Sequence, residues 1–131
     1  MLPDATGRYA ALFRPTHMIG LELGVSVASV VLCGQPTGVP AEFLSDVVAV
    51  TKKPLNAGEV LDGEGGFCVW GKQIPAETSL RMKALPIGLA HDLRLARDVA
   101  KGQILGWSDV DYDKNADIVT TRRQMEDAFG T

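Results

Sequence analysis

Two stretches of this chain repeat one pattern: Leu55-Asn56-Ala57-Gly58-Glu59-Val60-Leu61 and Val99-Ala100-Lys101-Gly102-Gln103-Ile104-Leu105. Each reads as an apolar residue, two small or polar residues, a glycine, a polar residue, a β-branched residue and a leucine. A glycine in this place turns the chain where a residue with a Cβ would be strained. The apolar pair that follows can enter a strand and bury one side chain in two. The repeat therefore predicts one small β-rich module with two related halves rather than an enzyme active site.

The sequence around the repeat is typical of a compact β unit with a helix at its end. Short apolar runs at 47–50, 67–70, 80–84 and 93–95 predict strands, and turn-forming residues separate them at regular intervals. Residues 116–129 predict a helix, with Asn115 as its N-cap and an apolar stripe of Ile118, Met125 and Phe129. We expect a mainly β fold with flanking helices.

The N-terminal third has a different pattern. Residues 9–13 form a short apolar run that predicts a strand, and Pro15 ends it. The stretch from Thr16 to Cys33 favours a helix, because Gly34 and Pro36 stand where a helix would stop, although alternating apolar residues at 21–27 also fit a strand. Such an apolar helix needs cover on more than one side, so we expect the chain to form a homo-oligomer.

Composition and charge narrow the possible partners. The net charge of −3 over 131 residues, with no basic run beyond Arg122-Arg123, excludes an obvious nucleic-acid-binding surface. Cys33 and Cys68 lack the spacing of a zinc site or a disulfide framework. The apolar stretch 18–33 is too short and too polar for a membrane span, and we recognise no signal peptide. We therefore expect a cytoplasmic protein with reduced thiols, no bound metal and no membrane partner.

One polar cluster, Arg14-Pro15-Thr16-His17, could bind a ligand. It lies at a predicted strand-to-helix junction, where Arg14 can hold a phosphate or carboxylate and helix N–H groups favour anions, with Thr16 and His17 adding hydrogen bonds. The other interpretation is a Thr16 cap beside an exposed Arg14 and a structural His17. No residue stands out as catalytic.

Other polar groups are predicted to be structural. His91 and Asp92 would point to opposite faces of a strand, and Asp109, Asp111 and Asp113 would share one solvated edge. The glycines of 63–66 lack both the spacing and the preceding strand of a dinucleotide-binding loop.

Three motifs in order resemble a SAF domain, a small β-clip module named for sialic-acid synthase, antifreeze and flagellar assembly proteins. They are 53–61 with the first glycine turn, Leu85-Pro86-Ile87-Gly88-Leu89-Ala90 in the centre, and 97–105 with the second turn. The resemblance covers about residues 46–111. It implies that a SAF-type β-clip follows the strand–helix segment and precedes the C-terminal helix.

The flanking sequence extends the resemblance to a family of enzymes. Residues 13–23 and Gly34-Gln35-Pro36-Thr37-Gly38 are similar to bacterial NAD(P)-dependent oxidoreductases called homoserine dehydrogenase-like, some of which resemble deoxyxylulose-phosphate reductoisomerases. In that family a Rossmann domain comes first, a catalytic domain follows, and a SAF-like domain closes the chain. This chain resembles only the C-terminal part. The resemblance implies that Arg14, Thr16 and His17 lie near the substrate site of such a parent enzyme.

These expectations give a three-part organisation. Residues 1–41 would belong to the catalytic domain of the parent, 42–112 would form the SAF β-clip, and 113–131 would form a helical tail. The chain would hold no cofactor and would be inactive alone, with NAD(P) bound by the Rossmann domain of the parent. The alternative is a free-standing SAF module that binds a carbohydrate or a partner protein.

Overall fold

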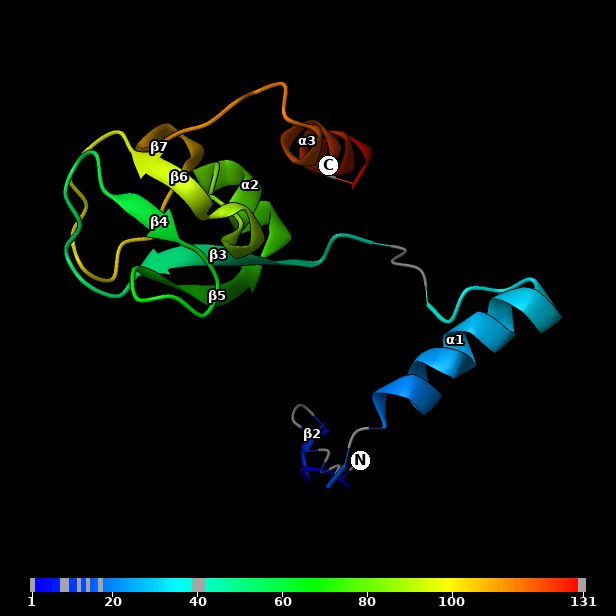
Figure 1. Cartoon of the computed structure of the whole chain (residues 1–131). Coiled ribbons are helices and arrows are strands. Elements are labelled where there is room, and N and C mark those ends of the chain that lie inside the picture. The colour runs from blue at the N-terminus through cyan, green and yellow to red at the C-terminus, as the bar shows by residue number, and fades with distance from the viewer. Residues whose placement is uncertain are drawn as a thin grey trace. The chain divides into compact units, whose positions relative to one another are not determined.

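The computed structural model describes residues 2–7, 10–11, 13, 15–16, 18–38 and 42–129, and the chain divides into two compact units, Met1–Pro40 and Ala41–Thr131. In the first unit, strand β1 (Leu2–Pro3) pairs antiparallel with β2 (Ala10–Ala11), and helix α1 spans Ile19–Cys33 (Figure 1). The predicted helix is confirmed, although it begins at Ile19 and not at Thr16. Gly34 ends it in a left-handed conformation, with φ of 64°, and its N–H donates to the carbonyl of Val30.

The second unit contains two small antiparallel sheets. Strand β3 (Ser45–Thr51) pairs with β5 (Val69–Pro75), while β6 (His91–Leu95) lies between β4 (Val60–Asp62) and β7 (Val110–Asp111). The helices of this unit are α2 (Ala76–Met82), the 3₁₀ turns η1 (Ile87–Leu89) and η2 (Trp107–Asp109), and α3 (Asp117–Phe129). Five short strands flanked by helices confirm the predicted fold class.

The two repeated stretches pair with each other at equivalent positions. The N–H of Leu55 donates to the carbonyl of Val99 at 3.0 Å, and the N–H of Val99 donates back to Leu55 at 2.9 Å. Each turn glycine then bonds to the strand that leads into the other turn: Gly58 donates to Leu95 at 2.7 Å, and Gly102 donates to Thr51 at 2.9 Å. Both glycines have positive φ, 86° and 80°. The prediction of two related glycine turns is confirmed, and each turn holds the other in place.

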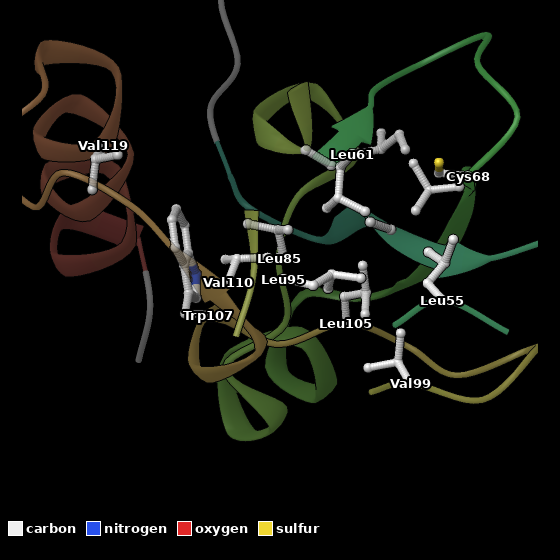
Figure 2. Close-up of a cluster of buried hydrophobic side chains, with 14 residues drawn as sticks. Leu55, Leu61, Cys68, Leu85, Leu95, Val99, Leu105, Trp107, Val110 and Val119 are labelled. Atoms are coloured by element: carbon white, nitrogen blue, oxygen red, sulfur yellow. The ribbon is translucent and has the colours of Figure 1, made fainter. Parts of the chain in front are cut away.

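A single apolar core lies between the sheets and the two turns. Leu61 and Leu105, which close the two repeats, are both fully buried, as is Leu85 of the central motif (Figure 2). The cluster also contains Ala49, Leu55, Cys68, Val69, Ile87, Ala90, Leu95, Val99, Trp107, Val110 and Val119. The apolar residues that open and close the two repeats, Leu55 with Leu61 and Val99 with Leu105, therefore join the turns to the core.

Two sequence-based predictions about strands are wrong in detail. Residues 80–84 are not a strand, because α2 runs to Met82 and Lys83 ends it with φ of 49°; only Ala84 forms a β-bridge, with Gly106. The strand predicted at 67–70 begins at Val69. The carboxylate of Asp62 accepts the N–H groups of Phe67 and Cys68, which keeps those two residues in the loop.

The apolar stripe predicted for α3 does not face the core. Ile118 is 60% exposed and Phe129 is 45% exposed, whereas Val119 is buried. The face that meets the rest of the unit carries Val119 and, one turn later, Arg122. The prediction from apolar spacing put the buried face of α3 in the wrong place, because the charged side chain of Arg122 supplies much of the contact between α3 and the rest of the unit.

The turn geometry predicts that an added Cβ at Gly102 is costly although space is available for it. No heavy atom lies within 4 Å of that Cβ position, so the cost comes from the positive φ alone. We expect Gly102→Ala to lower the free energy of unfolding by about 1–2 kcal/mol. Gly88→Ala is the control, since Gly88 also has open space but no positive φ, and it should leave stability nearly unchanged. Urea unfolding measures both; equal midpoints for the two variants would contradict the account.

Candidate functional site

The structure describes only part of the predicted ligand site. Arg14 and His17 lie outside the described residues, so the prediction about their side chains stays untested. Thr16 is exposed. It does not cap α1, since that helix begins at Ile19 and Met18 occupies the N-cap position.

Within the part of the chain that the structure describes, a well-connected polar cluster lies between α3 and the start of β3. Arg122 donates from Nη2 to Oδ2 of Asp46 at 2.6 Å and from Nη1 to Oδ1 at 3.2 Å. The hydroxyl of Ser79, on α2, donates to the same Oδ2 at 2.6 Å. Glu126 accepts from Nε of Arg122 at 2.6 Å. We call Asp46, Ser79, Arg122 and Glu126 the clasp.

The clasp is largely removed from solvent, and its charges stabilise each other. The side chains of Asp46 and Arg122 are only 6% and 12% exposed. Burial by itself would raise the pKa of Asp46, but hydrogen bonds from Arg122 and Ser79 and the positive charge of Arg122 outweigh burial and lower it. The pKa of Arg122 is raised, because its bonds to Asp46 and Glu126 outweigh the opposing effect of burial. Both side chains are therefore ionised at neutral pH.

Sequence reasoning missed the clasp for a physical reason. Asp46 and Arg122 are far apart along the chain, and no spacing rule connects a carboxylate at the start of a strand with an arginine on a late helix. In the sequence the Arg122-Arg123 pair is only a short basic run. In the structure Arg122 reaches Asp46, whereas the guanidinium of Arg123 lies 4.4 Å from the centroid of the Trp107 ring.

A hollow of about 290 Å³ lies beside α3. Leu89, Leu93, Trp107 and Tyr112 line it from the β module, and Ile118 and Val119 line it from α3. His91 and Asp113 supply the main polar groups of its wall. A mainly apolar hollow of this size suits a small apolar group better than a charged substrate.

Two predictions about polar residues need correction. His91 and Asp92 do pair, with Nδ1 and Oδ2 2.7 Å apart, because the register of β4 and β6 shifts near them and Asp92 adopts φ of 57°. Asp109 is not solvated: it is buried, and it accepts from Nε of Arg97 at 2.7 Å and from the N–H of Gly106 at 2.9 Å. Arg97, the basic residue before the second repeat, thus anchors η2.

The carboxylate of Asp62 organises the end of the loop at 62–67. The N–H groups of Phe67 and Cys68 already donate to the carboxylate of Asp62, and these bonds outweigh partial burial and lower the pKa of Asp62. Burial and the neighbouring Asp62 raise the pKa of the Cys68 thiol, so it is protonated at neutral pH. The N–H groups of Phe67 and Cys68 are therefore not free to bind a phosphate.

The clasp is suited to holding α3 against the start of β3 rather than to catalysis. Ser79 and Asp46 form a hydroxyl–carboxylate pair, but Ser79 is 1% exposed and no substrate can reach it. Among the described residues, no group of three or more histidine, cysteine or acidic side chains is placed to hold a metal ion. In the same part of the chain, no helix combines the length and the apolar character needed to cross a bilayer.

Comparison with known proteins assigns the β module to a family. Residues 46–111 match the family model described as the SAF domain, which is half of the chain. No curated protein matches the sequence. The matched range begins at Asp46 of the clasp and ends with β7, so the clasp joins the family module to α3, a helix outside the match.

The clasp predicts how stability depends on pH. The pKa values of Asp46 and Asp62 are lowered in the folded state, so both carboxylates contribute stability that is fully present above the pKa of an unfolded aspartate, about 4. We expect the free energy of unfolding to fall as pH drops below that value through the two lowered pKa values. Urea unfolding between pH 7 and pH 2 measures this. Asp46→Asn should reduce the acid dependence, and an unchanged slope in that variant would contradict the assignment.

Proposed function

This chain belongs to the SAF domain family, and from that premise we propose that it forms the C-terminal region of an NAD(P)-dependent oxidoreductase of the homoserine dehydrogenase-like kind. Its role is structural: it supplies an assembly surface to the catalytic and Rossmann domains of the parent enzyme. A cytoplasmic location is part of the proposal. The motifs at 13–23 and 34–38, which lie outside the SAF match, support the oxidoreductase context.

The single observation that carries the assembly role is the surface of α1. Leu23, Val25, Val27, Val30, Val31 and Leu32 are all exposed, and Val31 and Leu32 are 74% and 80% exposed. Soluble proteins rarely leave such a contiguous apolar surface in water. We propose that the rest of the parent's catalytic domain covers this helix, and that two copies of α1 cover each other when the rest of that domain is absent.

The proposal places cofactor binding outside this chain. A dinucleotide needs backbone N–H donors at a glycine-rich turn that opens a helix. The glycine-rich turn at 62–67 leads instead into β5, and the N–H groups of Phe67 and Cys68 donate to Asp62. NAD(P) would therefore bind to the Rossmann domain of the parent.

Arg14, Thr16 and His17 would serve the parent at its substrate. In this proposal the guanidinium of Arg14 holds an anionic group of the substrate, and Thr16 and His17 add hydrogen bonds. These residues precede α1, the helix that we propose to lie against the catalytic domain. They would bind and orient the substrate and would not carry out the redox step.

The reading frame upstream of Met1 tests the oxidoreductase context. An in-frame sequence with a Rossmann fingerprint is the expected result. A stop codon there would contradict the proposal and favour a free-standing module.

The assembly role predicts self-association of the isolated chain. Light scattering of the 131-residue chain should give the mass of a dimer or larger species, because α1 carries a contiguous set of exposed apolar side chains. The double variant Val27→Glu/Val31→Glu, one turn apart on α1, should give a monomer. Leu44→Glu is the matched control, since Leu44 is 72% exposed but lies outside α1. A clean monomer mass for the unmodified chain at high concentration would overturn the assembly role.

A further inference from the structure

Helix α3 is attached to the SAF module chiefly through side chains. The N–H groups of Val119 and Thr120 donate to the carbonyl of Ala116, so the backbone bonds at the start of α3 are local. The two sheets of the module are formed by β3 to β7 without any contribution from α3. Nothing in the hydrogen bonding of the sheets therefore requires the helix to stay in place.

The apolar part of the attachment is small. Of the residues of α3, only Val119 is buried, and it faces Trp107 across the contact (Figure 2). The hollow of about 290 Å³ lies between α3 and the β module, and both Val119 and Trp107 line it. Unfilled space removes the dispersion contacts that would otherwise hold two surfaces together.

Arginine side chains supply most of the remaining attachment. Arg122 makes the two bonds to Asp46 described above, and its guanidinium also lies 5.1 Å from the centroid of the Phe43 ring. Arg123 stacks on Trp107. Glu126 lies on α3 itself and bonds to both arginines, so it moves with the helix and cannot replace Asp46 as an anchor.

We propose that α3 is a latch: the helix is released from the SAF module as a unit while the module stays folded. The Asp46–Arg122 ion pair is the contact that holds the helix in the closed position. Release uncovers the apolar and aromatic surface of Leu89, Leu93, Trp107 and Tyr112. Asp113 to Ala116, the short turn before α3, acts as the hinge. This device does not depend on the oxidoreductase context, because every contact that carries it lies within 42–129.

Thiol labelling tests the latch in the full chain. In a Cys33→Ser background, which removes the exposed thiol, Val119→Cys places a reporter under α3, and the buried Cys68 reports on opening of the module. We expect the new thiol to react at least about tenfold faster than Cys68, because it needs only a local opening. Equal rates for the two thiols would overturn the proposal.

A second substitution, with a matched control, tests whether the Asp46–Arg122 pair holds α3 closed. Arg122→Met should accelerate labelling at position 119 about tenfold; the rate at Cys68 should rise by no more than the same factor, because opening of the module follows release of α3, and Cys68 should stay at least about tenfold slower than position 119. Arg81→Met removes an exposed pair, Arg81–Glu77 at 3.8 Å, and should change neither rate. An Arg122→Met variant in which position 119 is labelled no faster than before, or in which the two thiols react at one common rate, would overturn the proposal.

Hydrogen exchange of the unmodified chain covers the case in which Val119→Cys fails to fold. The amides of Thr121 to Met125, within α3, should exchange through an opening that leaves the amides of Ala49 and Thr51 in β3 protected. Exchange of both sets through one common opening would contradict the latch.

Discussion

The reciprocal hydrogen bonds between Leu55 and Val99 are the constraint on which the rest of the module depends. They join two turns that the sequence separates, and each turn glycine then bonds to the strand entering the opposite turn. The side chains after the glycines, Leu61 and Leu105, can reach the same core only when this pairing is made. The repeated sequence thus forms two equivalent turns that pair with each other, and the core lies between these turns.

The polar interactions attach further elements to the two paired turns; they do not form the pairing itself. Arg97 ties η2 to the approach of the second turn through Asp109, and Asp62 ties the loop before β5 to the end of β4. The clasp attaches α3, which lies beyond the family match, to the first residues of β3. A buried ion pair of this kind is a weak source of net stability but a strong determinant of which surfaces meet. The SAF module can therefore be complete while its appended helix is held less firmly.

Sequence alone predicted the parts of the structure that depend on local chemistry. The glycine turns, β3, the C-terminal stop of α1 and the existence of α3 follow from turn residues and apolar spacing. It failed where a distant partner decides the outcome. The orientation of α3 follows from Arg122 reaching Asp46, and the pairing of His91 with Asp92 follows from a register shift against β4. The helix at 76–82 was missed because a short apolar run also fits a strand.

The candidate ligand residues show the same limit. The prediction that Arg14, Thr16 and His17 form an anion site rests on the residue types and on the family resemblance. The clasp, which the sequence did not indicate, is the better-defined polar cluster, yet its burial suits it to holding a helix. Our proposals for this chain therefore rest more on surfaces, those of α1 and α3, than on a reactive centre.

Native-state hydrogen exchange of four amides tests the central claim most directly. If the two glycine turns form one interlocked unit, the N–H groups of Leu55, Gly58, Val99 and Gly102 should exchange with the same free energy of opening, equal to that of global unfolding, at every urea concentration. Opening of one turn at a lower free energy, while the amides of the other stay protected, would contradict the account.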